Sequence, residues 1–462
     1  MNGIVAYGAY LPRHLLARES IREVLGEGGG KGTRTVASYD EDTTSMAVEA
    51  ARRARKAADF SPASLHFATT APAYADKTNA TAVHAALDLP PEVFAGDHVG
   101  SVRAAVGALR AAAADGGLAV LSDIRTGRPG SADEANGGDG AAAFAFGSGD
   151  GVIAELVAQA SATAEFLERW RAPGASYSQT WEERFGLDVY LPLIREVVAQ
   201  ALRRAGIERP DLAVVASPHA RAARAGMKPL ADVLVDGVEA RTGNLGAAHL
   251  GLLLCEALDR AQPGQTILAV NAADGADAFV LRVTEAIEQA RKGGPALAEL
   301  ERATPVEYAT FLTWRGMLER EPPRRPDPVP VQAPPAARAT SWKFAFVGSR
   351  CRSCGRVHLP PQRVCADCGA VDAMEPAPTA DRHGTITTYT VDRLAYSPSP
   401  PVISAVIDFD GGGRFSCELT DCRPDEIQAG TRVELTFRRM FTSAGIHNYF
   451  WKARPIREVA LG

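Results

Sequence analysis

The fold of the C-terminal third is decided by two short stretches, Cys351-Arg352-Ser353-Cys354-Gly355 and Cys365-Ala366-Asp367-Cys368-Gly369. Each is a Cys-x-x-Cys pair followed by glycine, and ten residues separate the pairs. Each Cys-x-x-Cys turn directs two thiolates at one metal ion, and the glycine lets backbone amides turn toward the sulfurs. Four thiolates saturate a tetrahedral zinc ion and leave no open position for a substrate. The pattern therefore predicts a structural zinc ribbon at 342–375, with these four cysteines as ligands.

Short runs rich in β-branched and aromatic residues follow the cysteine pairs. Turns such as Asp410-Gly-Gly-Gly413 and Ala429-Gly430 separate these runs. Five short strands in succession predict a small OB-like β-barrel over 376–462. The expected strands are Gly384–Asp392, Val402–Phe409, Arg414–Thr420, Thr431–Phe437 and Tyr449–Ala453.

The charge of the C-terminal third bears on nucleic acid, which zinc ribbons and OB barrels often bind. Residues 342–462 hold 15 Lys and Arg against 13 Asp and Glu, without a basic stripe interleaved with aromatic residues. The whole chain has a net charge of −5. This balance predicts no nucleic-acid partner.

Length and composition describe an ordinary globular protein of several domains. A chain of 462 residues is too long for one core. No apolar run reaches the length of about 18 residues that a membrane span needs, so we expect no membrane partner. The N-terminus, Met1–Ala6, lacks a basic leader and is typical of a first strand. The other three cysteines are scattered, which fits zinc in a reducing cytoplasm better than a disulfide framework.

A proline-rich stretch divides the chain at 321–341, EPPRRPDPVPVQAPPAARATS. Proline at this density neither continues a helix nor sits inside a sheet, so we expect an extended spacer. Residues 306–320 have apolar side chains at helical spacing, which predicts a helix that docks on one of the domains. The predicted organisation is one domain at 1–305, a docking helix and linker at 306–341, the ribbon at 342–375 and the barrel at 376–462.

The N-terminal domain repeats one order of elements, helix followed by strand. The strands of both helix–strand pairs recur at an offset of about 147 residues. Two related βαβ-containing halves, about 1–160 and 161–290, predict a duplicated, layered α/β domain with buried sheets. An ordinary doubly wound fold with coincidental similarity is the alternative. The matching segments are 45–70 with 191–217, and 104–123 with 249–272.

Three motifs resemble those of the thiolase superfamily, in its ketoacyl synthase III and hydroxymethylglutaryl-CoA synthase branch. Pro218–Arg224 (PHARAAR) follows a strand and resembles the motif with the branch's catalytic histidine. Gly243–Ala248 (GNLGAA) resembles the segment with its catalytic asparagine, and Gly138–Ala143 (GDGAAA) the superfamily's small-residue strand entry. Trp170-Arg171 and Tyr177 are also similar to the branch. The resemblance implies a thiolase-like fold with His219 and Asn244 as catalytic residues. Without it, a structural histidine, a plain turn and close packing are the ordinary interpretations.

The C-terminal third resembles the zinc-ribbon/OB-fold family that accompanies thiolase-like enzymes. The similar residues are Trp342-Lys-Phe344, the two cysteine pairs, His358-Leu-Pro-Pro361 and Tyr449–Pro455 (YFWKARP). In that family the module is a partner of acyl-CoA chemistry, either fused or as a separate subunit. The resemblance implies an acyl-CoA substrate with coenzyme A as its carrier. It also implies a homodimer or a heteromer with a thiolase-like partner.

The chain departs from the branch at its nucleophile, a cysteine that opens a helix, where the helix dipole lowers the thiol pKa. The matching stretch 97–109, DHVGSVRAAVGAL, holds no cysteine. Counting back from Leu109 places the family cysteine at Val102 or, with a shift of one residue, at Ser101. The branch also has a glutamate acid/base after its third strand, and the matching residues 69–74, TTAPAY, contain no carboxylate. Ordinary ping-pong acyl transfer through a thioester therefore does not fit.

The retained His219 and Asn244 point to enolate chemistry. In the family, such a pair donates hydrogen bonds to a thioester oxygen, and these bonds strengthen as the oxygen becomes an enolate. Aldol-type cleavage of a β-hydroxyacyl-CoA needs these donors and a base, but no acyl-enzyme. We therefore expect an enzyme that forms or cleaves C–C bonds of acyl-CoA by aldol or retro-aldol steps. Its base is left open among Tyr74, Asp97, His98 and Tyr177.

Two alternatives stay open. Ser101 is a candidate nucleophile with His219 as its base, which would make the protein an acyltransferase or thiolase variant. A serine at a helix start is more commonly an N-cap. The chain is alternatively a non-catalytic, thiolase-like subunit of an acyl-CoA-processing complex. In each case Arg221, Arg224 and Lys228 are candidates for binding the phosphates of coenzyme A, although single basic residues on a helix are commonly solvated.

Overall fold

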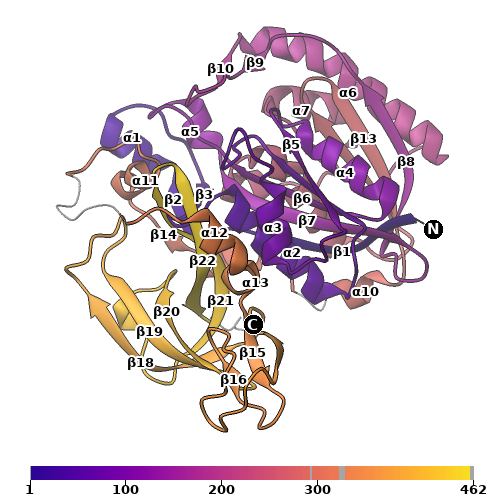
Figure 1. Cartoon of the computed structure of the whole chain (residues 1–462). Coiled ribbons are helices and arrows are strands. Elements are labelled where there is room, and N and C mark those ends of the chain that lie inside the picture. The colour runs from indigo at the N-terminus through magenta and orange to yellow at the C-terminus, as the bar shows by residue number, and fades with distance from the viewer. Residues whose placement is uncertain (1, 292–293, 322–327, 458–462) are drawn as a thin grey trace. The chain divides into compact units, whose positions relative to one another are not determined.

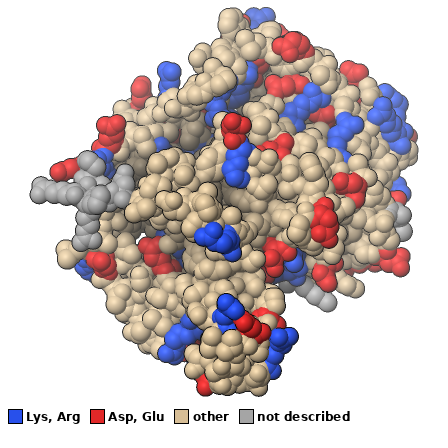
Figure 2. Space-filling model, in the orientation of Figure 1, with Lys and Arg blue, Asp and Glu red and all other residues tan. Residues whose placement is uncertain are grey.

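The computed structural model describes residues 2–291, 294–321 and 328–457, and the chain forms two compact units (Figure 1). The first unit comprises Met1–Ser38, Met46–Thr81 and Pro91–Leu312. The second comprises Tyr39–Ser45, Ala82–Pro90 and Thr313–Gly462. No helix in the described part of the chain is both long and apolar enough to cross a membrane. Basic and acidic side chains are interspersed on the face drawn in Figure 2.

The first unit is built around a nine-stranded sheet with the order β11-β12-β13-β8-β1-β7-β6-β4-β5. From β1 outward, β7 and β6 pair antiparallel and β4 pairs parallel. From β8 outward, β13 and β12 pair antiparallel and β11 pairs parallel. The two halves thus repeat one pattern and meet where β1 pairs with β8, which confirms the predicted duplication. The strands are β1 (Asn2–Tyr10), β4 (Ser64–Thr69), β5 (Phe94–Val99), β6 (Leu118–Ile124), β7 (Asp139–Ser148), β8 (Ala154–Ala162), β11 (Leu212–Ala216), β12 (Thr266–Ala272) and β13 (Ala276–Val283).

Helices cover both faces of this sheet because its strands are apolar on both sides. On β13, Phe279 and Leu281 join the core of α4 (Ala104–Asp115) and α9 (His249–Arg260). The alternate residues Ala278 and Val280 join the core of α6 (Glu183–Ala205). On β1, a Cβ at Gly8 would lie 2.7 Å from the carbonyl oxygen of Ala50, so α2 (Thr43–Ala57) packs directly on the strand.

Shorter elements connect these layers in the first unit. They are β2 (His14–Ala17), α1 (Glu19–Leu25), β3 (Thr33–Val36), α5 (Ala132–Asn136), β9 (Arg169–Trp170), β10 (Gln179–Thr180), α7 (Ala220–Gly226), η1 (Lys228–Leu230), α8 (Val238–Thr242), η2 (Gly246–Ala248), α10 (Ile287–Ala290), η4 (Ala298–Arg302), β14 (Thr304–Pro305) and α11 (Tyr308–Trp314). The helix α3 (Ala80–Ala86) begins in the first unit, and most of its residues belong to the second. The helix at the end of the first unit, α11, is shorter than the expected 306–320. It buries Tyr308 and Phe311 in the first unit.

The second unit contains a three-stranded sheet and a closed barrel, as the sequence predicts. The sheet joins β15 (Val347–Cys351), β16 (Val357–His358) and β17 (Met374–Pro378). The barrel order is β18-β19-β20-β22-β21. Its strands are β18 (Gly384–Asp392), β19 (Val402–Phe409), β20 (Arg414–Leu419), β21 (Arg432–Ser443) and β22 (Ile446–Pro455). The last two strands are longer than predicted and form a hairpin around Ala444-Gly445.

The proline-rich stretch differs from the extended spacer expected of it. Residues 322–327 lie outside the described part of the chain. Beyond them, α12 (Ala333–Arg338) and α13 (Thr340–Ala345) are helical. Pro334 and Pro335 occupy the first turn of α12, where backbone N–H groups have no partner within the helix, so proline loses no hydrogen bond there.

A buried ionic network holds part of the second unit together. Arg438 on β21 lies 2.6 Å from carboxylate oxygens of both Glu41 and Asp421. Lys452 on β22 lies 3.0 Å from Asp40, which is fully buried. Burial acts to raise the pKa of Asp40, but the charges of Lys452 and Arg438 outweigh it and lower that pKa. This pairing explains how the barrel strand β21 can continue through the buried, charged Arg438.

Candidate functional site

His219 and Asn244 line the same cavity of the first unit, which has a volume of about 510 Å³. His219 follows β11 and is the N-cap residue of α7. Asn244 lies between α8 and η2, directly before the buried helix α9. The loops that leave the second half of the sheet thus bring together two residues that lie 25 positions apart in the sequence.

Both ring nitrogens of His219 are bonded to backbone groups. Nδ1 accepts a hydrogen bond from the Ala222 N–H at 3.0 Å. Nε2 lies 2.9 Å from the carbonyl oxygen of Glu183, the first residue of α6. A carbonyl only accepts, so Nε2 carries the proton and the imidazole is the neutral Nε2–H tautomer. With 6% exposure, the ring is held in one orientation.

The side chain of Asn244 is also fixed by the backbone. Its Nδ2 donates to the Ser217 carbonyl at 2.9 Å, and its Oδ1 accepts from the Gly246 N–H at 3.0 Å. A Cβ at Gly243 (φ 76°) would lie 2.1 Å from the Gly137 carbonyl oxygen, so this turn requires glycine. Because an amide carries two N–H hydrogens, one remains for a further acceptor.

The loop of Asn244 is anchored by Asp123, a fully buried carboxylate at the end of β6. Its Oδ1 accepts from the Thr70 N–H at 3.2 Å and its Oδ2 from the Ala247 N–H at 2.9 Å. Arg125 donates to the Thr70 hydroxyl at 3.1 Å. Burial raises the pKa of Asp123, while Arg125 and these hydrogen bonds lower it. This network joins the ends of β4 and β6 to the start of α9.

Glu168 lines the same cavity, and no motif in the sequence indicated it. Its side chain is 6% exposed, and Oε2 has no hydrogen-bond partner among the described residues. Burial raises the pKa of Glu168, while the nearby positive charge of Arg169 lowers it. Among the described carboxyl groups that line this cavity, only Glu168 is buried, and its Oε2 is unbonded.

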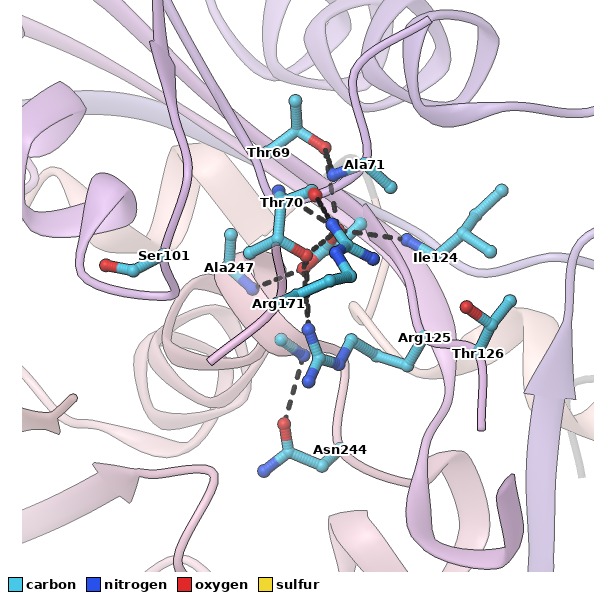
Figure 3. Close-up of polar contacts among 12 residues, drawn as sticks. Thr69, Thr70, Ala71, Ser101, Ile124, Arg125, Thr126, Arg171, Asn244 and Ala247 are labelled. Carbon is cyan, nitrogen blue, oxygen red and sulfur yellow. Dashed lines mark hydrogen bonds and ion pairs between the residues drawn. The ribbon is translucent and has the colours of Figure 1, made fainter. Parts of the chain in front are cut away.

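Ser101 and Val102 line a separate, smaller cavity of about 80 Å³. The Ser101 hydroxyl accepts from the Arg103 N–H at 3.2 Å, in the turn before α4, whose N-cap residue is Arg103. Figure 3 shows Ser101 apart from Asn244 and from the Arg125 network. The two cavities share Arg125, Arg169 and Pro218, whereas His219 lines only the larger one.

Of the three residues predicted to bind the phosphates of coenzyme A, two line the larger cavity and one does not. Arg221 and Arg224 line the larger cavity, together with Arg18 and Lys31, which the sequence did not indicate. Lys228 is exposed on η1 and belongs to the lining of neither cavity.

The four candidate bases also lie outside the linings of these two cavities. Asp97 caps α3 by accepting from the N–H groups of Asn79 and Ala80, both at 2.7 Å. His98 lies beside His66, with ring nitrogens 3.2 Å apart. The ring of Tyr177 lies under the Arg128 guanidinium. Asp97, His98 and Tyr177 thus each have a structural contact of their own.

The small-residue motif at 138–143 is explained by close packing. A Cβ at Gly138 would lie 2.0 Å from the Thr242 carbonyl oxygen. Asp139 is fully buried; it accepts from the Ala37 N–H at 2.7 Å and lies 3.4 Å from Arg34. The motif therefore joins β7 to α8 and β3, beside the loop of Asn244.

The four predicted cysteine ligands form one cluster in the second unit. Their sulfurs all lie within 4.8 Å of one another, with 3.7 Å between Cys351 and Cys368. Sulfurs around a tetrahedral zinc ion are about 3.8 Å apart, given zinc–sulfur bonds of about 2.3 Å. Gly355 and Gly369, with φ of 77° and 72°, complete the two turns. The residues therefore fit a structural zinc ion with four thiolate ligands.

Comparisons with known proteins agree with both parts of the chain. Residues 344–375 match the model of the ChsH2 rubredoxin-like zinc ribbon domain, and 378–438 that of the ChsH2 C-terminal OB-fold domain. The N-terminal part is 30% identical to the hydroxymethylglutaryl-CoA synthase of Methanosphaera stadtmanae over 349 residues, covering 69% of this chain and 99% of that protein. The enzyme of Methanopyrus kandleri is 31% identical, with 69% and 98% covered.

The chain belongs to the hydroxymethylglutaryl-CoA synthase family. Solved structures show the same fold. MvaS in complex with 3-hydroxy-3-methylglutaryl coenzyme A is 21% identical, with a TM-score of 0.57 over 71% of this chain and 94% of that chain. The 3-oxoacyl-(acyl-carrier-protein) synthase III of Aquifex aeolicus VF5 is 21% identical, with a TM-score of 0.52 over 61% and 100%. The resemblance to this branch, fused to a zinc-ribbon and OB-fold module, is thereby confirmed.

Proposed function

We propose that this protein forms or cleaves a carbon–carbon bond at the α-carbon of an acyl-CoA thioester, through an enolate and without a covalent acyl-enzyme. Its relatives are named as hydroxymethylglutaryl-CoA synthases, which supports acyl-CoA condensation as the class of reaction. The observation that carries the finer proposal is the meeting of His219 and Asn244 in one cavity. The sequence resemblance supports the absence of an acyl-enzyme, because it aligns the family's nucleophile with Val102 or Ser101 and neither residue is a thiol.

The donors of the cavity suit a thioester oxygen that gains negative charge. Asn244 donates its remaining amide hydrogen to this oxygen. His219 donates from Nε2, and the thioester oxygen takes the place of the Glu183 carbonyl as acceptor. A neutral imidazole suits this task because it donates without carrying its own charge. Donors fixed in advance favour the enolate over the ground-state thioester.

Cationic side chains of the cavity suit the phosphates of coenzyme A. Arg18, Lys31, Arg221 and Arg224 line it. Arg221 also pairs with Glu183 at 3.5 Å, and both side chains are mostly exposed, so this ion pair is weak and readily exchanged for a phosphate. Lys228 is left out of this proposal because it lies outside the lining.

The test is turnover of a panel of β-hydroxyacyl-CoA and β-ketoacyl-CoA thioesters, with products identified by mass spectrometry. We expect cleavage by the wild type and by Ser101→Ala. We expect His219→Ala and Asn244→Ala to lose about 100-fold or more, the usual effect of removing one oxyanion donor. Both side chains also bond backbone groups, so a melting curve of each variant accompanies the assay. Loss of turnover in Ser101→Ala, with an acyl adduct on the wild type, would instead establish a serine acyltransferase.

A second candidate is a non-catalytic subunit that presents acyl-CoA to a thiolase-like partner. It is favoured by the bonding of both His219 nitrogens and of both Asn244 side-chain atoms to the backbone, as in a purely structural site. Silence of the wild type across the panel, together with copurification of a thiolase-like protein, would select this candidate.

A further inference from the structure

We infer that Glu168 is the catalytic acid and base of this cavity, the group that carries the proton between substrate atoms. The inference rests on the proposed function and names a residue for the step that the function leaves open. It is carried by position and by bonding: Glu168 lies in the cavity of His219 and Asn244, is 6% exposed, and has an oxygen without a partner among the described residues.

The backbone on both sides of Glu168 is fixed. Its carbonyl oxygen accepts from the Trp181 N–H at 2.7 Å. The next residues form β9, which pairs with β10. Arg169 bonds both carboxylate oxygens of Asp133, at 3.1 and 2.5 Å. The carboxyl group therefore projects from a hairpin that is tied down, rather than from a free loop.

Gly186 on α6 places Glu168 beside His219. A Cβ at this glycine would lie 2.5 Å from Cδ2 of the His219 ring and 2.9 Å from Cγ of Glu168. Both side chains therefore pack against α6 at the one position, residue 186, where the helix has no side chain on this face. Any larger residue at 186 would displace one of them, so this glycine keeps the imidazole and the carboxyl group together.

Three other buried carboxyl groups of the first unit, Asp123, Asp139 and Glu134, are bonded by neighbouring groups, which sets Glu168 apart from them. Asp123 accepts from Thr70 and Ala247, and Asp139 accepts from Ala37. Glu134 accepts from the Tyr308 hydroxyl and from the Gly130 N–H. Buried polar groups that serve the fold are normally satisfied in this way. A buried carboxyl group that is not satisfied destabilises the fold, and such groups concentrate at functional sites.

The proton balance of the cleavage direction is complete with this one group. The Glu168 carboxylate takes the proton of the β-hydroxyl group, and a carbonyl forms at the β-carbon. The Cα–Cβ bond breaks, and its electron pair becomes the enolate whose oxygen faces His219 and Asn244. The protonated Glu168 then gives its proton to the α-carbon, which yields a shorter acyl-CoA and a ketone or aldehyde. Condensation is the reverse, with Glu168 removing the α-proton first.

Burial is the main influence on Glu168 and raises its pKa. The charges of Asp274 and Asp133 act in the same direction, whereas the positive charge of Arg169 lowers it. An acid/base group works best when its pKa lies near the working pH, so a raised glutamate pKa fits a group that both takes and returns a proton.

The test measures how fast the α-hydrogens of acetyl-CoA and propionyl-CoA exchange for deuterium in D₂O, as monitored by mass spectrometry. The turnover panel described above is run in parallel. Glu168→Gln keeps the shape of the side chain and removes its basicity. We expect it to lose about 100-fold or more in both assays, within the usual range for a general base. Glu165→Gln, an exposed glutamate three residues earlier, is the matched control and should match the wild type. Glu168→Asp should recover part of the exchange, with a shifted pH inflection.

The outcomes separate this inference from the function on which it rests. Wild-type turnover with undiminished exchange in Glu168→Gln would overturn the role of Glu168 and leave the enolate function in place. Absence of turnover and of exchange in the wild type, with every thioester, would overturn both. Loss of exchange in Glu168→Gln together with a collapsed melting curve would assign the residue to the fold instead.

Discussion

Two buried carboxyl groups of this molecule, Glu168 in the first unit and Asp40 in the second, have opposite surroundings. Asp40 lies 3.0 Å from Lys452 and 3.5 Å from Arg438, and accepts from the Thr420 hydroxyl at 3.0 Å. Its pKa is lowered because these charges outweigh burial. One oxygen of each carboxyl group lacks a hydrogen-bond partner, but that of Asp40 faces Arg438, whereas Glu168 forms no ion pair among the described residues and burial raises its pKa. The same chemical group is thus ionised and structural in one place, whereas in the other burial favours its protonated form.

The difference shows how partners, rather than burial, decide what a carboxyl group does. Burial disfavours the charged form at both positions. Where cations are fixed beside the carboxylate, removing one of them leaves an uncompensated charge and destabilises the fold strongly. Where no such partner exists, the group can change its protonation state without rearranging its surroundings.

Zinc removal should have the largest effect, because four thiolates that share one ion lose their common partner. Structural zinc contributes about 10–16 kcal/mol of apparent binding free energy in isolated zinc-finger peptides. We expect Cys365→Ser to lose the bound zinc and to expose the amides of β15, β16 and β17 to hydrogen exchange. Cys422→Ser, outside the cluster, is the control. Full zinc content in Cys365→Ser, measured by atomic emission, would contradict the site.

Arg438→Met should destabilise the second unit by about 3–5 kcal/mol, because it leaves Asp40, Glu41 and Asp421 without their shared cation. Protection of β21 and β22 amides from hydrogen exchange measures this loss. Arg414→Met is the matched control, since its partner Asp408 is about half exposed and such pairs contribute less than about 1 kcal/mol. Equal losses of stability in Arg438→Met and Arg414→Met would show that burial of the network does not increase its contribution to stability.

The pH dependence of stability should have opposite sign at the two carboxyl groups. A lowered pKa adds stability that is present above the unfolded value, about 3.9 for Asp, and is lost as pH falls through the folded pKa. A raised pKa adds stability that is present below the unfolded value, about 4.3 for Glu, and is lost as pH rises through the folded pKa. Melting curves of the wild type, Asp40→Asn and Glu168→Gln across a range of pH measure these two contributions to stability. Parallel changes in the two variants would remove the contrast.

Much of the fold was predictable because its signals are local or periodic. The cysteine pairs with their glycines indicated the ribbon, and the repeated helix–strand order indicated the duplicated domain. His219 and Asn244 were also found from sequence, since each lies in a recognisable motif, and the structure places both in one cavity. The prolines of α12 misled because their effect depends on position within a helix, and the first turn tolerates them.

What the sequence could not indicate depends on contacts between distant residues. The extension of β21 through Arg438 is stabilised by Asp40 and Glu41, roughly 400 positions away in the sequence. Glu168 lies in a segment without periodicity or motif, and only the fold brings it to His219. The candidate bases chosen from sequence, such as Asp97 and His98, lie near the right strands but outside the two cavities described above.

The most direct test of the account measures α-hydrogen exchange and melting temperature on the same preparation of Glu168→Gln at pH 8. If the unpaired carboxyl group of Glu168 is the base, exchange falls by about 100-fold or more. The melting temperature should stay the same or rise, because the substitution removes a buried charge that burial disfavours. Exchange equal to that of the wild type, or a loss of stability like that of Arg438→Met, would contradict the account.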